Sequence, residues 1–424
     1  MIIDLKYRTE IDGLRALAII SVVIYHFFPH IMPSGFLGVD IFFVISGYLI
    51  TAHFISLQKN NKINSLRIFY SRRIKRLLPA LFIFFTITTL VITNIFLNSD
   101  INKYGSSLLA AKTFWSNFYF WRDGGYFGTS DQLKPLLHIW SLSVEEQFYI
   151  LYPTFILISI WITKKFKLPI IYLVFILTLL SFLLWLYLHH MGGANPAFFL
   201  LPTRAWQFGL GGFLVFIKLR SNSLKTSTTN IFIIASVLAL FFGLIVNTNI
   251  IIQTIIVSLG ATFFIYFSFK SKVPLLWIFQ NIFTVWIGRI SYSIYLYHWP
   301  IAVILFYYFI DSPPFFMSVI GIFLSLILGY LSCKYIETPF RRRFTLTQTI
   351  LLILICSLIS LSAIKLANQN KSESFIEKWS VANGSNYRCP VSSYYLYGAS
   401  SRACVIEEGL KSKPTIAIFG NSHA

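Results

Sequence analysis

The chain has 424 residues, of which 56% are hydrophobic and only 12% are charged, and its formal net charge is +20. Soluble domains carry about a quarter charged residues, so this composition excludes an ordinary soluble fold. A basic soluble protein would suggest nucleic acid as partner, but here Lys and Arg cluster in loops between apolar segments. The sequence therefore predicts an all-α polytopic membrane protein that binds no nucleic acid.

Eleven apolar segments approach the roughly 20 residues that a helix needs to cross a bilayer. The first segment follows Asp12 and Arg15 and has no small-residue cleavage site behind it, so it is interpreted as a retained span and not as a signal peptide. The predicted spans are 12–30, 36–57, 77–97, 139–161, 168–189, 203–218, 230–247, 250–268, 284–310, 315–334 and 346–366.

The loops between these spans differ sharply in charge. Five short loops rich in Lys and Arg all follow even-numbered spans, whereas the alternate loops contain none apart from four spread along the long 98–138 segment. The positive-inside rule therefore places the N-terminus in the cytosol, and an odd number of spans places the tail outside. Cys389 and Cys404 lie in that tail, where an oxidising environment would favour a disulfide between them.

The first span carries two ionisable residues, Arg15 and His26. Eleven residues correspond to about 1,100° of helical rotation and a rise of roughly 16 Å, so both side chains share one face at different depths. A cation suits the phosphates of a coenzyme, and a histidine suits proton removal from a hydroxyl or transient acyl carriage. The structural alternative is that Arg15 reaches the cytosolic headgroups and that His26 is a packing residue.

A basic run at 71–79 precedes the third span and contains Arg72, Arg73 and Arg76. It is interpreted either as a clamp for the nucleotide phosphates of a donor or as topology-setting charge that attracts anionic lipid. No Walker-type loop or GxGxxG motif accompanies it, so nucleotide hydrolysis and dinucleotide binding are not supported.

Further polar residues fall in or beside later spans. The loop at 98–138 is predicted to be external, and its aromatic residues form either an interfacial belt or a sugar-stacking surface. His138 closes this loop and is expected to be interfacial. Glu145 and Glu146 open the fourth span and point to different helix faces, either as functional groups or as charges at a helix N-terminus. His298 lies within the ninth span, where an ionisable residue favours a functional interpretation.

Polar composition returns at 367–414, and the chain then ends in a β-favouring run followed by Gly420-Asn421-Ser422-His423-Ala424. A strand that enters a tight turn can expose a serine as a nucleophile. The alternative is an ordinary polar end. We expect residues 415–424 to be the truncated start of an extracytoplasmic domain.

Seven motifs, in order over residues 7–343, resemble those of the membrane acyltransferase-3 family. They are Asp12–Ala16, the spacing from Arg15 to His26, Phe42–Tyr48, Arg72–Pro79, Pro135–Tyr149, Ile290–Pro300 and Ile336–Arg341. The additional helix at 344–366, the linker at 367–414 and the Gly-Asn-Ser-His end resemble the subgroup with a fused α/β SGNH/GDSL-type domain. That subgroup includes O-antigen (lipopolysaccharide) and peptidoglycan O-acetyltransferases.

The resemblance implies an enzyme of the bacterial inner membrane that moves an acetyl group from cytosolic acetyl-CoA to a hydroxyl of a cell-surface polysaccharide. Membrane lipid, acetyl-CoA and a glycan acceptor are the implied partners, and no metal is expected. By analogy His26 is the leading catalytic residue and Arg15 its partner, and Arg72, Arg73 and Arg76 contact the donor. Glu145, His298 and Ser422 complete the expected catalytic residues, Ser422 as the nucleophile of the soluble domain.

Two positions depart from the family pattern. Asn421 replaces the acid of the usual Gly-Asp-Ser, and Gln207 stands where the family more often carries Glu. Because residues 415–424 are expected to be only the start of the soluble domain, the Asp and His partners of a Ser-His-Asp site would lie in its remaining part. The main alternative function is a transporter or flippase of a lipid-linked sugar, and a structural partner of another membrane enzyme is a third.

Overall fold

A computed structural model describes residues 7–60, 64–96, 98–123, 133–167, 169–217, 226–269, 271, 273–309 and 313–370. Within these ranges all regular structure is helical, and none of it is β-strand. The strand predicted near 415–419, Ser422, Cys389 and Cys404 all lie outside the described residues.

Each of the eleven predicted spans coincides with a helix. These helices are α1 (Thr9–Phe27), α2 (Gly38–Asn60), α3 (Ser65–Ile95), α6 (Ile139–Phe166), α7 (Ile170–His190), α9 (Leu201–Phe216), α10 (Thr226–Ile245), α11 (Ile250–Phe267), α13 (Ile282–Tyr308), α14 (Phe315–Ser332) and α16 (Leu346–Asn370). Shorter helices connect them, namely α4 (Asn98–Lys112), α5 (Ser116–Arg122), α8 (Ala194–Phe199), α12 (Trp277–Gln280) and α15 (Thr338–Arg342), with single turns η1 (Gly35–Leu37), η3 (Pro274–Leu276) and η4 (Cys333–Glu337).

Among the described residues, eight helices are long and apolar enough to cross a membrane. The remaining three of the eleven are α1, α6 and α9. Helix α1 carries Glu10, Asp12 and Arg15, α6 carries Glu145 and Glu146, and α9 has only 16 residues. The chain is thus a multi-pass membrane protein, and the number of crossings remains a prediction.

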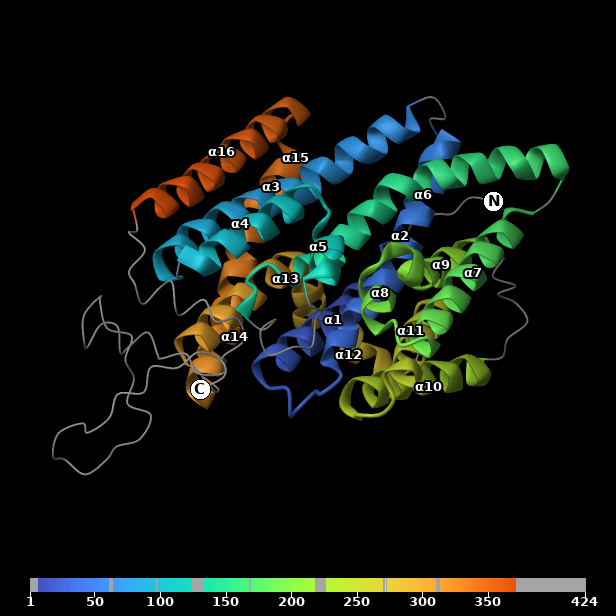
Figure 1. Cartoon of the computed structure of the whole chain (residues 1–424). Helices are drawn as coiled ribbons and strands as arrows, with labels where there is room; N and C mark the ends of the chain where they lie inside the picture. The colour runs from blue at the N-terminus through green and yellow to red at the C-terminus, as the bar shows by residue number, and fades with distance from the viewer. Residues whose placement is uncertain are drawn as a thin grey trace.

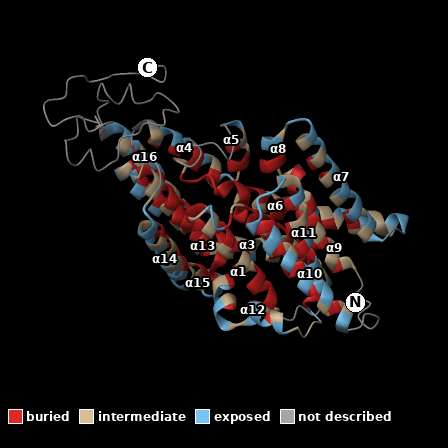
Figure 2. Cartoon of the chain, turned by 90° about the horizontal axis from the view of Figure 1, so that it is seen from below, coloured by how far each residue is buried: buried red, intermediate tan, exposed pale blue. Residues whose placement is uncertain are grey.

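Helix α1 lies in the centre of the bundle, packed against α13 and α2 (Figure 1). Helix α2 packs in turn on α9 and α11, and α13 packs on α14. In Figure 2 the buried residues concentrate in this central group, while α7, α10 and α16 present exposed residues to the outside. Only 11% of the apolar stretch of α16 is buried, as expected for a helix that faces lipid.

Glycines allow the central helices to approach closely. A Cβ atom added at Gly288 of α13 would lie 1.8 Å from the carbonyl oxygen of Asp12 in α1. Backbone cannot yield as a flexible side chain does, so any larger residue there must separate the two helices. The close α1–α13 contact fixes the helices that carry Arg15, His26 and His298.

We expect Gly288→Ala to lower the free energy of unfolding by about 1–3 kcal/mol, the usual cost of overpacking a well-packed core. Gly105→Ala in α4 is the matched control, because its added Cβ would meet only the Ile364 side chain at 3.5 Å and alanine favours a helix by about 1 kcal/mol over glycine. Thermal unfolding of the detergent-solubilised variants measures both. Equal melting temperatures for the two variants would contradict the packing argument.

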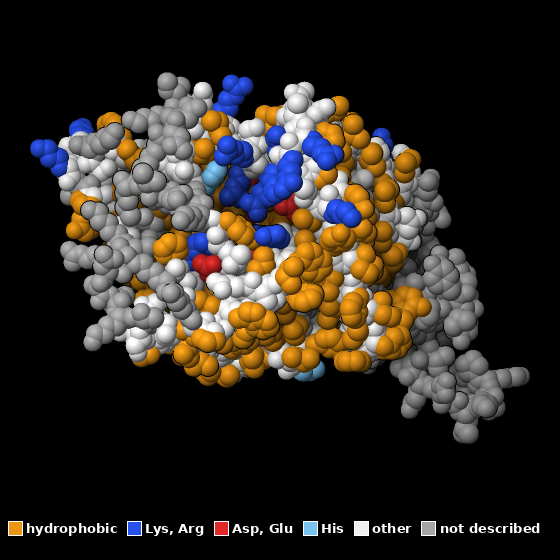
Figure 3. Space-filling model, turned by 180° about the vertical axis from the view of Figure 1, so that it is seen from behind, with side chains coloured by type: hydrophobic (Ala, Val, Ile, Leu, Met, Phe, Trp, Pro, Cys, Tyr) orange, Lys and Arg blue, Asp and Glu red, His pale blue; other side chains and the backbone are white. Residues whose placement is uncertain are grey.

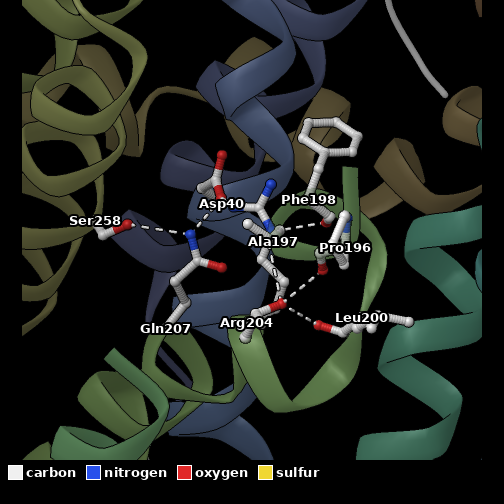
Figure 4. A network of polar contacts seen from close by, with 9 residues as sticks. Asp40, Pro196, Ala197, Phe198, Leu200, Arg204, Gln207 and Ser258 are labelled. Atoms are coloured by element: carbon white, nitrogen blue, oxygen red, sulfur yellow. Dashed lines mark hydrogen bonds and ion pairs between the residues drawn. The ribbon is translucent and has the colours of Figure 1, made fainter. Parts of the chain in front are cut away.

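A buried ion pair joins α2 to α9 (Figure 4). Arg204 donates from Nη1 to Asp40 Oδ1 at 2.8 Å and from Nε to the carbonyl oxygen of Phe198 at 2.8 Å. Gln207 also donates its amide to Asp40 and lies 3.5 Å from the Ser258 hydroxyl. An amide at 207 can donate to Asp40, whereas an ionised carboxylate there would repel it. The departure at Gln207 therefore fits this network.

The segment predicted as an external loop folds into two helices that enter the bundle. Helix α4 packs against α3 and α16, and α5 packs against α6 and α8. Asn117 is buried and donates to the carbonyl oxygen of Phe199, and the Ser116 and Ser143 hydroxyls lie 2.7 Å apart. Trp115 is 56% exposed. These contacts fix the beginning of α6, where the candidate site begins.

Candidate active site

Two histidines that lie 272 positions apart in the sequence meet inside the bundle. His26 of α1 and His298 of α13 are both buried, and His26 Nδ1 lies 3.1 Å from His298 Nε2. Their rings are nearly parallel, with an interplanar angle of 22° and centroids 5.2 Å apart. Trp299 closes the other side of His26, with ring centroids 4.5 Å apart. The pair is thus enclosed by ring contacts from Trp299 and His138 inside the bundle.

The hydrogen bonds assign the protons of this pair. His298 Nδ1 lies 2.7 Å from the carbonyl oxygen of Tyr295, which can only accept, so Nδ1 carries the proton. In a neutral imidazole Nε2 of His298 is then an acceptor, and His26 Nδ1 must donate to it. His26 Nε2 consequently carries a lone pair. That atom is the candidate base or nucleophile.

A cavity of about 80 Å³ lies between α1, α2, α3, α6 and α13. Its charged lining residues are Arg15, Arg73, Arg76 and Glu145, and its hydroxyl-bearing lining residues are Ser46, Ser141, Tyr149, Ser291, Tyr292 and Tyr295. This volume holds roughly five waters, so it fits the end of a chain and not a whole nucleotide. In Figure 3 Lys and Arg side chains gather around a hollow on one face of an otherwise largely hydrophobic surface.

Tyr295 connects the cavity to the histidine pair. Tyr295 lines the cavity, its hydroxyl lies 2.7 Å from the Ser141 hydroxyl, and its carbonyl oxygen accepts a hydrogen bond from His298 Nδ1. The same hydroxyl donates to the carbonyl oxygen of His138 at 2.9 Å. The end of the cavity and the histidines therefore share one short segment of α13.

A carboxylate and three cations shape the polar side of the cavity. Glu145 accepts from Tyr149 at 2.6 Å and from Ser46 at 3.4 Å. The Arg73 guanidinium lies 4.5 Å from the centroid of the Tyr149 ring, a distance at which a cation is attracted to an aromatic face. Glu146 is not among the lining residues. Of the two adjacent carboxylates, only Glu145 thus faces the cavity.

Arg76 is oriented by an acid from a distant part of the chain. Glu337 is buried, and its carboxylate lies 3.9 Å from Arg76 Nε. It stands at the end of the π-helical turn η4, directly before the Thr338-Pro339 pair. Proline cannot donate the next helical hydrogen bond, which favours such a local change of pitch. The motif at 336–341 therefore supplies a counter-charge to the cavity.

The remaining predicted residues are placed differently. Arg15 pairs with Asp12 at 3.4 Å and lines the cavity, whereas His26 contacts His298 deeper in the bundle. Arg72 is exposed and lines a separate surface depression with Asn64, Arg67, Ile68 and Ser71. Ser422 lies outside the described residues. Among the described residues, no group of three or more His, Cys, Asp and Glu side chains is arranged to hold a metal ion.

Three residues of the site were not predicted from the sequence to belong to it. His138 was expected at the interface but is buried beside His298, with ring centroids 5.6 Å apart. Ser141 and Tyr295 were not singled out, although they join the cavity to the histidines. Their sequence signal was the density of Ser, Tyr and His within the two apolar segments 138–149 and 291–298.

Comparison with known proteins gives one family. Residues 8–334 match the family model Acyl_transf_3, described as an acyltransferase domain. O-acetyltransferase OatA of Staphylococcus aureus strain MRSA252 is 34% identical over 396 residues, which cover 84% of this chain and 63% of the relative. The S. aureus strain MSSA476 protein named Putative O-acetyltransferase SAS0844 is 33% identical over 352 residues, covering 80% of this chain and 58% of the relative. The chain thus spans about three fifths of these relatives, and no solved structure matches it significantly.

Proposed function

The chain belongs to this acyltransferase family, and from that premise we propose that it is a membrane O-acetyltransferase that uses acetyl-CoA and a glycan hydroxyl. The observation that carries the proposal is the His26–His298 pair, which Tyr295 links to a cation-lined cavity. The names of the relatives support transfer of an acetyl group to oxygen. The cell-surface glycan as acceptor rests on the family resemblance of the sequence motifs.

The cavity accepts the donor in this proposal. Arg15, Arg73 and Arg76 offer three cations at the end that the loop charges predict to be cytosolic, and guanidinium groups suit phosphate oxygens. The 80 Å³ cavity that they line suits the acyl end of a coenzyme, whose nucleotide then remains outside. Glu145 and its partners Tyr149 and Ser46 hold this lining in place.

His26 carries the acetyl group between the two substrates. Its Nε2 lone pair attacks the thioester carbon, the carbon–sulfur bond breaks, and coenzyme A leaves as the thiolate. His298 Nε2 accepts a hydrogen bond from the Nδ1–H group of His26 at 3.1 Å. This hydrogen bond stabilises the positive charge of the acetylated ring. An alcohol then attacks the acetyl carbon, and His26 departs as the neutral imidazole.

The acceptor side completes the transfer outside the cell. The tail is predicted to be external, and Ser422 is proposed to receive the acetyl group there before a glycan hydroxyl does. Membrane lipid surrounds the bundle, whose apolar helices make the protein multi-pass. Cellular location at a bacterial inner membrane remains part of the proposal.

Surface glycans from cells with and without the gene test this function. We expect base-labile acetate esters on glycan to require the gene, because an O-acetyl ester is the product. Mass analysis reveals each ester as an added acetyl mass. A flippase of a lipid-linked sugar would instead change the amount of surface glycan and leave its acetylation unaltered, and that result would refute the proposal.

A further inference from the structure

A third histidine lies beside the His26–His298 pair. His138 directly precedes α6 and is 2% exposed. Its ring packs edge-on against His298 with centroids 5.6 Å apart, and at a tilt of 54° against Tyr295 with centroids 5.4 Å apart. Its carbonyl oxygen accepts from the hydroxyls of Tyr295 and Ser141. His138 is therefore fixed by its backbone as well as by its ring.

A proline in the neighbouring helix orients this ring. Pro300 lies inside α13 and has no N–H, so the carbonyl oxygen of Leu296, four residues earlier, lacks its usual helical donor. His138 Nε2 lies 3.1 Å from that oxygen. A carbonyl can only accept, so Nε2 of His138 carries the proton and Nδ1 carries the lone pair.

The Nδ1 atom of His138 is buried and has no hydrogen-bond partner among the described residues. A buried acceptor without a donor lowers the stability of the fold by about 1–3 kcal/mol. Such an atom therefore calls for an explanation, for example a catalytic role. It lies in a cluster with His26 and His298, the two histidines that the proposed reaction uses. A donor that arrives there with the substrate would satisfy it.

We propose that His138 is the general base for the alcohol that takes the acetyl group from His26, an inference that rests on the proposed function. As the alcohol oxygen attacks the acetyl carbon, its proton passes to His138 Nδ1. The bond from the acetyl carbon to His26 Nε2 breaks, and the positive charge moves from the acetylated His26 to His138. Water later removes the proton, which balances the protonation of the coenzyme A thiolate.

Neither His26 nor His298 is able to accept the proton of the alcohol in the second step. An acetylated His26 has no lone pair at Nε2 and cannot also accept the proton of the incoming alcohol. His298 is occupied at both ring nitrogens, by Tyr295 and by His26. Of the three clustered imidazoles, His138 is the one whose lone pair is left for the second step.

His138→Gln tests the inference in the full chain in proteoliposomes with radiolabelled acetyl-CoA. A glutamine can still donate to the Leu296 carbonyl, but its amide is not a base. We expect a burst of coenzyme A release equal to the protein present, followed by turnover reduced about 100-fold or more. A burst accompanied by turnover within about threefold of the unsubstituted protein would overturn the inference, as would loss of the burst in folded protein.

A second variant, His138→Ala, tests the inference if His138→Gln does not fold. In His138→Ala, added imidazole is expected to restore at least about tenfold of the lost turnover, because it supplies a base to the vacated space. A purely structural role predicts no such rescue. Label recovered on glycan identifies a glycan hydroxyl as the alcohol, and label recovered on protein identifies a serine such as Ser422. Absence of acetyl transfer in the unsubstituted protein would refute the proposed function itself.

Discussion

Replacing His26 with Gln is expected to lower acetyl transfer by about 1,000-fold or more, the largest effect of any single substitution in this chain. Glutamine can still donate a hydrogen bond towards His298, but it has no nucleophilic lone pair. Both the burst and the steady-state release of coenzyme A should disappear. Release measured on purified protein in proteoliposomes, together with ester acetate on cellular glycan, checks this result.

His30 provides the matched control for this substitution. It lies three residues beyond α1 and is exposed, so His30→Gln removes an imidazole of the same helix–loop region without altering the buried pair. We expect His30→Gln to retain activity within about twofold of the unsubstituted protein. Comparable activity in the His26 and His30 variants would show that the histidine pair is not the acyl carrier.

The second large effect is expected at the donor end of the cavity. Arg73→Gln should raise the KM for acetyl-CoA about 10- to 100-fold with little change in kcat, because a hydrogen bond to a charged group contributes about 1.5–3 kcal/mol. Arg73 is preferred to Arg76 for this test, because its substitution is less expected to destabilise the fold. Loss of Arg76 would leave the buried carboxylate of Glu337 without its cation and so destabilise the fold.

Arg72→Gln is the control for this prediction, because it removes the same charge from the neighbouring position. Arg72 is exposed and does not line the cavity, so its KM for acetyl-CoA should rise less than about threefold. Initial rates at varied acetyl-CoA give both constants. Equal increases in the two variants would indicate that general surface charge, and not the cavity, attracts the donor.

Much of the fold followed from hydropathy. All eleven predicted spans coincide with helices, because apolar runs near 20 residues have few other solutions in a bilayer. Helices α4 and α5 escaped prediction because their sequence is mixed, and burial of Asn117 and Ser116 depends on partners in α6 and α8. Such tertiary contacts leave no periodic signal in a single sequence.

The site was predictable where one helix decides the geometry. Residues three apart share a helix face, so the sequence places Arg73 and Arg76 on one face of α3 and Arg72 on a different face. The approach of His26 to His298 was not predictable, because it joins residues 272 positions apart. The orientation of His138 had a local clue in Pro300, which releases a carbonyl, but its partner depends on how α6 begins.

The most direct test supplies acetyl-CoA to one face of sealed membranes that contain the full chain. The donor is placed on the face that carries Arg73, and a glycan acceptor is placed on the opposite face. We predict ester acetate on the glycan across the membrane, and its loss in His26→Gln. Esters formed only on the side that holds acetyl-CoA would contradict transfer through the histidine pair.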